Sequence, residues 1–282
     1  MDKKRIIVYL MIPILLITGG WVLFNSKIRP NQYQLLTPYS IFTAERLSVT
    51  QSRTGRDGRL EILIPRGRVM TGKDRYTAEL SLDDFWIDQV PVTAGDYPRF
   101  ISETRELAPR YHDEYAKYWR EKQYEILPAV FVSWGQAEAY CEYYGGHLPT
   151  EAQWEKAARG ENGIILYWDD SEKAFDKANY DSFFGEKTPA GWLPKGKTVY
   201  GVLDMAGNVR EWVLDWLIDE KQKASADPWE MIRDKHAEDA GRILKGGAYS
   251  DDVSHLRLNT RDAHAPNSPG INRGFRCVYE AE

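Results

Sequence analysis

The chain has 282 residues, a length that allows one substantial domain with appended segments. Its formal net charge of −5 argues against nucleic acid as the main partner, because phosphate binding needs a clustered basic surface. Ten tryptophans and seventeen tyrosines are a heavy aromatic load, and such rigid rings suit a fold with long irregular segments.

The first 24 residues predict a membrane anchor. Residues 1–5 are basic, and residues 6–24 form an uncharged apolar run close to the ~20 residues that span a bilayer. The basic flank predicts a cytoplasmic tip at 1–5, a single pass through the inner membrane and a periplasmic C-terminal domain. A cleaved signal peptide, with Thr18, Gly19 and Gly20 as its cleavage site, is the alternative. The anchor is favoured because the apolar run continues past these three residues.

A polar stretch at residues 25–58, interrupted by proline and glycine, indicates a stalk between the anchor and the domain. The domain is then expected at residues 59–282. A strand is predicted at 80–88, where Phe85, Trp86 and Ile87 are apolar.

Two helices are predicted from their N-terminal capping boxes. Ser133 and Gln136 stand three residues apart before an apolar stripe, and Thr150 and Gln153 repeat the pattern. Gly160 is placed to end the second helix.

Four motifs in the second half of the chain carry a family resemblance. They lie at residues 147–160, 200–212, 244–249 and 273–277, with Arg257 and Arg261 between the last two. In this order they resemble the sulfatase-modifying-factor family, which includes the formylglycine-generating enzymes. The resemblance implies an α+β domain, a loop-rich variant of the C-type-lectin fold, whose opening strand would lie at 61–67. The apolar run at 6–24 adds one transmembrane helix before this domain.

The chain contains two cysteines, Cys141 and Cys277. In an exported domain an even pair indicates a disulfide, whereas two buried free thiols are the alternative. The resemblance implies the bridge, because exported members of the family pair cysteines at these positions. Closing so long a loop would contribute about 4–5 kcal/mol in the chain-entropy model.

The resemblance also places a redox site after Lys245, where oxygen-using members carry two cysteines that bind copper. Here those positions hold Asp251 and Leu256, and Ala248 stands where the enzymes have a serine. A copper(I) site needs soft thiolate ligands, which neither a carboxylate nor a leucine provides. Formylglycine generation by the cysteine and copper mechanism is therefore not expected, and neither is copper.

A polar cluster remains in that segment and forms the candidate groove, made of Asp251, Asp252, His255, Arg257 and Arg261. The first three could supply a hard-metal site or a general base. The two arginines are expected to brace loops, and solvated surface is the simpler interpretation of the rest.

The resemblance further implies structural calcium. By the motif match, its ligands would be the side-chain carboxylates of Asp204 and Glu211 and the backbone carbonyls of Gly207 and Val209. Calcium favours such a mixture of oxygens in a loop. The alternative is a loop held by hydrogen bonds alone. A second calcium loop would begin at Asn179 and Tyr180.

These features favour a membrane-anchored domain that binds an exported protein or peptide, as an envelope component or an immunity-type protein. The alternative is an enzyme, a metal- or oxygen-dependent oxidase that modifies an exported peptide or a peptide-derived product. A purely structural envelope protein is the third hypothesis.

Overall fold

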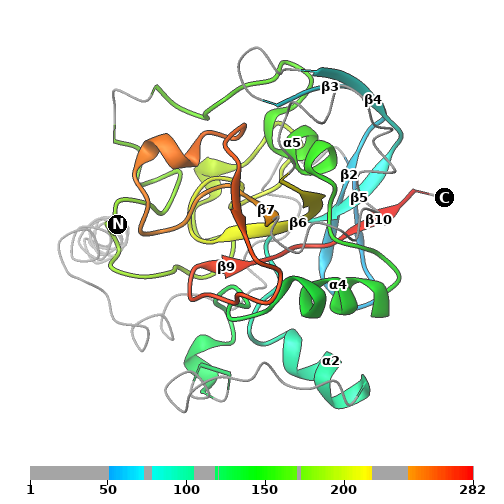
Figure 1. Cartoon of the computed structure of the whole chain (residues 1–282), viewed down its shortest axis with the longest axis vertical. Helices are drawn as coiled ribbons and strands as arrows, with labels where there is room; N and C mark the ends of the chain where they lie inside the picture. Colours follow the sequence, from blue (N-terminus) through cyan, green and yellow to red (C-terminus); the bar gives the residue numbers. More distant parts are fainter. Residues whose placement is uncertain are drawn as a thin grey trace, which may run out of the picture.

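The computed structural model describes residues 51–72, 78–104, 118–119, 121–169, 173–217 and 241–281. Helices and sheets are mixed along the chain, which confirms the predicted α+β class (Figure 1). Within these ranges no helix is both long and apolar enough to cross a bilayer. The predicted anchor at 6–24 and most of the predicted stalk lie outside them.

The first sheet is built from both ends of the described chain. Its strand order is β1-β2-β5-β10, and all its pairs are antiparallel. The strands are β1 (Ser52–Thr54), β2 (Leu60–Ile64), β5 (Phe85–Asp88) and β10 (Val278–Glu280). Ile87 pairs with Ile62 on one side and with Val278 on the other, and all three side chains are fully buried. Strand β10, from the C-terminal part of the described chain, thus lies in the same sheet as β2 and β5 from its N-terminal part.

The second four-stranded sheet has the order β8-β7-β6-β9 and occupies the centre of Figure 1. Its strands are β8 (Asp262–His264), β7 (Arg242–Lys245), β6 (Arg210–Trp216) and β9 (Arg273–Gly274). β6 and β9 run parallel, and the other pairs are antiparallel. This sheet brings the motifs at 200–212, 244–249 and 273–277 together.

A hairpin of β3 (Gly67–Thr71) and β4 (Ala78–Leu82) corrects the two strand boundaries predicted from sequence. The segment 61–67 ends as a strand at Ile64, and the segment 80–88 is divided between β4 and β5. Asp84 accounts for both breaks, because its Oδ1 accepts the backbone N–H of Arg66 at 2.8 Å. The side chain replaces a strand hydrogen bond and turns the chain toward the hairpin.

Both predicted capping boxes are present. They begin α4 (Trp134–Tyr143) and α5 (Glu151–Arg159), and Gly160 ends α5 with a φ of 64°. α5 packs against β3, β6 and β7, so its residues face the central sheet. The described chain also contains α2 (Tyr97–Thr104) and the 3₁₀ turns η5 (Lys122–Tyr124), η6 (Pro194–Gly196) and η7 (Val253–Leu256).

Two apolar clusters form most of the core. One joins the first sheet to α5 and the 200–206 segment, and it contains the fully buried Trp154. The other joins α2, α4 and the end of the chain, where Tyr97 stacks on Tyr140 at 5.6 Å between ring centroids. Aromatic rings thus pack α2 against α4, and rings of irregular segments also stack, as Phe175 does on Phe183, which agrees with the role that the composition predicts.

Candidate functional site

The two cysteines form a disulfide, which confirms the predicted pairing. Cys141 comes from α4 and Cys277 from the residue before β10, with 5.4 Å between their Cα atoms. Both residues have no exposed surface. Since the chain holds two cysteines and both are bridged, it has no thiolate to offer a metal or a substrate.

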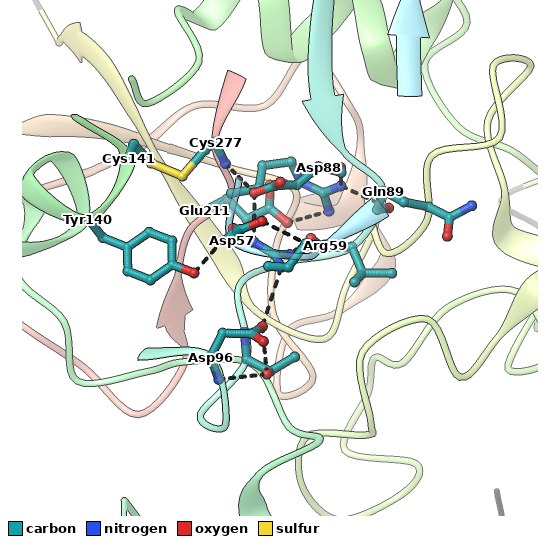
Figure 2. Close-up of polar contacts among 12 residues, drawn as sticks. Asp57, Arg59, Asp88, Gln89, Asp96, Tyr140, Cys141, Glu211 and Cys277 are labelled. Atoms are coloured by element: carbon teal, nitrogen blue, oxygen red, sulfur yellow. Dashed lines mark hydrogen bonds and ion pairs between the residues drawn. A yellow bond between two sulfur atoms is a disulfide. The ribbon is translucent and has the colours of Figure 1, made fainter. Parts of the chain in front are cut away.

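A buried ionic network lies beside this bridge (Figure 2). The backbone N–H of Cys277 donates to Asp88 Oδ2 at 2.8 Å, and Arg59 Nη1 reaches the same oxygen at 2.7 Å. Arg59 Nε also lies 3.3 Å from Asp96. The network ties the segment before β2 to the disulfide.

Tyr140, on the same helix as Cys141, extends the network. Its hydroxyl donates to Asp57 at 3.3 Å. Burial raises the pKa of Tyr140, which keeps the hydroxyl protonated as a donor. The contacts of this region therefore stabilise the fold of the domain.

Asp251, which stands where the enzymes have one redox cysteine, has both carboxylate oxygens engaged. Oδ1 accepts from Arg210 Nη2 at 2.8 Å, and Oδ2 accepts the backbone N–H of Ala248 at 2.7 Å. Arg210 Nε lies 2.8 Å from Asp262, so one guanidinium joins two carboxylates. These charge-assisted bonds fix the 248–251 turn on β6.

Leu256, at the other cysteine position, is fully buried in the core cluster that contains Trp154. Asp252 and His255 are exposed at η7. Asp252 accepts the N–H of Ser254 at 2.8 Å and lies 3.2 Å from His255 Nδ1, and the Ser254 hydroxyl lowers the pKa of Asp252 to about 2. Asp252 therefore caps the 3₁₀ turn, while Asp251 bonds with Arg210, and the two carboxylates act separately.

The two arginines of the candidate groove differ in exposure. Arg261 forms two hydrogen bonds with Glu151, at 2.6 and 2.7 Å, and thereby joins its loop to the start of α5. Lys245 lies 2.7 Å from Glu155 and 3.3 Å from Glu151, both on the same helix. Arg257 is exposed. Arg261 thus has the bracing geometry that the sequence predicts.

The expected calcium loop has one carboxylate that fits a cation and one that is already neutralised. Asp204 is half-buried, desolvation raises the pKa of its carboxyl to about 6, and this carboxyl accepts the N–H of Gly191 at 2.7 Å. Glu211 instead receives two bonds of 2.7 Å from Arg276 and one of 2.7 Å from Trp154 Nε1. Asp204, with the carbonyls of Gly207 and Val209, would hold an ion there, whereas Glu211 is committed to Arg276.

The second expected loop offers a different kind of fit. Asn179 is buried, and its Nδ2 donates to the carbonyl of Glu186 at 2.9 Å. Its Oδ1 is buried and has no hydrogen-bond partner among the described residues. The hydroxyl of Tyr180 accepts the N–H of Ala174 at 2.9 Å, and its backbone carbonyl accepts the N–H of Phe183 at 3.0 Å. In the described part of the chain no group of three His, Cys, Asp or Glu side chains is arranged around a common metal position.

Sequence reasoning missed two features of this region. One is the buried pair of Arg276 and Glu211, because the motif match assigns Glu211 to calcium. The other is Lys187, which is 3% exposed and lies between two tyrosine rings. Nothing in the local sequence around Lys187 distinguishes it from a surface lysine.

Comparison with known proteins agrees with the fold. Residues 46–281 match the family model described as the sulfatase-modifying factor enzyme 1-like domain. The chain belongs to this family.

Two relatives and one solved structure illustrate its range. The "Serine/threonine-protein kinase pkn1" of Chlamydia pneumoniae is 30% identical over 226 residues, which cover 76% of this chain and 36% of that protein. The chain thus spans about a third of the length of that relative. The "Inactive C-alpha-formylglycine-generating enzyme 2" of Mus musculus is 27% identical, with 77% of this chain and 85% of the relative covered. PvdO from Pseudomonas aeruginosa has the same fold, with a TM-score of 0.67 at 22% identity, over 83% of this chain and 99% of PvdO.

Proposed function

We propose that this chain is a membrane-anchored, periplasmic member of its family that binds an exported protein or peptide and does not oxidise it. The observation that carries the proposal is the disulfide, which holds both cysteines of the chain. Family chemistry through copper requires free thiolates, so a domain without them keeps the scaffold and loses the reaction. The mouse relative, whose name calls it inactive, supports the same interpretation.

A binding role is supported by the way the 246–273 segment is held. Its loops are long and irregular, yet Arg210 and Arg261 fix them to β6 and α5 through charge-assisted bonds. Variable loops on a rigid frame are the usual basis of recognition surfaces, as in C-type-lectin-like domains. The apolar run at 6–24 would keep this surface at one membrane, facing envelope proteins.

A peptide oxidation assay tests the loss of the reaction directly. We expect the purified chain, incubated in air with copper(I), a thiol reductant and a cysteine-containing peptide, to form no formylglycine from the peptide cysteine, as read by mass spectrometry. A formylglycine-generating enzyme assayed in parallel is the positive control. The proposal would be overturned, in favour of the oxidase, if the chain converts the peptide cysteine and if this conversion is lost in the Asp252→Ala or His255→Ala variant.

Binding is tested by photo-crosslinking in intact cells. A photoreactive residue replaces Ser250, which is exposed next to Asp251, and a matched control replaces Glu142, which is exposed on α4. We expect a discrete crosslinked partner from position 250 and none from position 142. Identical products from both positions, or none from either, would contradict a recognition surface at 246–273.

We also propose calcium as a structural ion at Asp204, and expect about 1 mM calcium to raise the melting temperature of the wild-type chain by several degrees. Asp204→Asn should abolish most of this shift, since it removes the carboxylate of the loop that is not bonded to Arg276. Asp252→Asn, which changes an exposed carboxylate outside the loop, is the control. An equal shift in all three proteins would show that calcium acts elsewhere.

A further inference from the structure

Strand β4 is a sheet edge that the described part of the chain leaves uncovered. Within the described ranges its backbone pairs with β3 alone, and no further backbone hydrogen bond reaches it. The hairpin lies at the periphery of the domain (Figure 1), and the first four of the five β4 residues are exposed. Strand alternation points every second N–H and C=O of β4 away from β3, so this edge has free groups that match those of another strand.

The other strand of the hairpin is capped by α5. Lys156 Nζ donates to the carbonyl of Gly67 at 3.1 Å, and Arg159 Nη1 donates to that of Met70 at 2.5 Å. Just after β3, the N–H of Gly72 donates to Glu155 Oε2 at 3.2 Å. Charged side chains beside an edge are a common protection against pairing with another strand. Among the described residues, β3 has this protection and β4 does not.

The apolar face of the hairpin continues beyond the part that α5 covers. Leu80 is paired with Val69, so the two side chains lie on the same face. Val69 has no exposed surface, whereas Leu80 is 40% exposed. Ala78 and Leu82 share this face, because side chains alternate along a strand. One face of β4 is therefore apolar and partly uncovered, directly beside its free edge.

The sequence of β4 fits a second copy of itself. In an antiparallel pair with Leu80 opposite its counterpart, Ala78 lies opposite Leu82, and Glu79 lies opposite Ser81. A slip of one residue sets apolar residues opposite polar ones. A pair centred on Glu79 sets Glu79 opposite itself, and a pair centred on Ser81 sets Glu79 opposite Asp83. Like charges directly opposite are destabilising, so charge and polarity together select one register.

We propose that two copies of the chain associate through β4, which pairs antiparallel with β4 of the second copy and centres on Leu80. The two hairpins then form one four-stranded sheet, with the two β4 strands in the middle and each β3 on the outside against its own α5. The two Leu80 side chains bury each other on the apolar face. Because the contact is symmetric, it closes after two copies. The inference does not depend on the binding partner proposed above.

Disulfide mapping of the full chain tests the register. The two native cysteines are already bridged, so Leu80→Cys provides one free thiol in each copy, and the proposed pair places the two thiols opposite each other. With a mild oxidant we expect a covalent dimer on a non-reducing gel. Leu217→Cys is the matched control, because Leu217 is also 40% exposed. Ser81→Cys tests the register, since Ser81 would face Glu79 and not its own counterpart. Both controls should crosslink at least about tenfold more slowly, because their thiols are not held within bridging distance.

Light scattering tests the association without an added thiol. In a mild detergent that accommodates the apolar run at 6–24, we expect the wild-type chain to pass from monomer to dimer as its concentration rises. Leu80→Arg sets two like charges opposite each other and should raise the dimer Kd at least about fivefold. Its melting temperature should stay within a few degrees of the wild type, since the substitution is on the surface. The proposal is overturned by a chain that stays monomeric, by a dimer that Leu80→Arg leaves unchanged, or by crosslinking of Leu80→Cys that is no faster than that of Leu217→Cys.

Discussion

Replacing Glu211 by glutamine is expected to destabilise the domain by about 3–5 kcal/mol, because it leaves the Arg276 guanidinium buried without a counter-charge. Both side chains are almost completely excluded from solvent, with exposed fractions of 1% and 0%. Arg276 also donates to the backbone carbonyls of Asp88, Gln89 and Leu203. It therefore joins the first sheet to the 200–206 segment and to β6, and the glutamine variant weakens both connections.

Urea unfolding followed by tryptophan fluorescence measures this loss, since the chain contains ten tryptophans and Trp154 donates to Glu211 itself. Glu79→Gln is the matched control, because its partner Arg68 lies 3.3 Å away on the surface and both side chains are more than half exposed. We expect less than about 1 kcal/mol there. If the two variants lose the same free energy, the buried pair does not organise the domain.

Several local features of this chain are predictable because their causes lie within a few residues. The capping boxes at Ser133 and Thr150 each depend on a residue three positions later, and both formed as predicted. The division of the segment 80–88 into two strands was not predicted. Its cause is the contact of Asp84 with Arg66, and those residues are 18 positions apart.

The site was harder to predict for the same reason. The carboxylate of Asp251 looks available in the sequence, but its partner Arg210 lies 41 positions earlier and meets it only through the central sheet. Glu211 matches a calcium motif, whereas its guanidinium partner is 65 positions away. Motif matching assigns a residue its role in relatives, and the competing contact becomes visible only when the strands are paired.

Removing the disulfide is the second change with a large expected effect. Cys141 and Cys277 are 136 positions apart, so the bridge closes a long loop and restricts the unfolded chain strongly. The chain-entropy model gives about 4–5 kcal/mol for such a loop. We therefore expect the Cys141→Ala, Cys277→Ala double variant to unfold at a much lower urea concentration than the wild type.

The same variant supplies an internal control, because it contains no sulfhydryl group at all. Dithiothreitol should lower the stability of the wild type toward that of the double variant and should leave the double variant unchanged. The buried contacts of Asp88 with Arg59 and with the Cys277 backbone do not involve sulfur, so the folded structure of the variant should keep them. Its crosslinking from position 250 should therefore persist below the unfolding transition. A variant that is as stable as the wild type would mean that packing of α4 against β10, and not the bridge, holds the ends of the domain together.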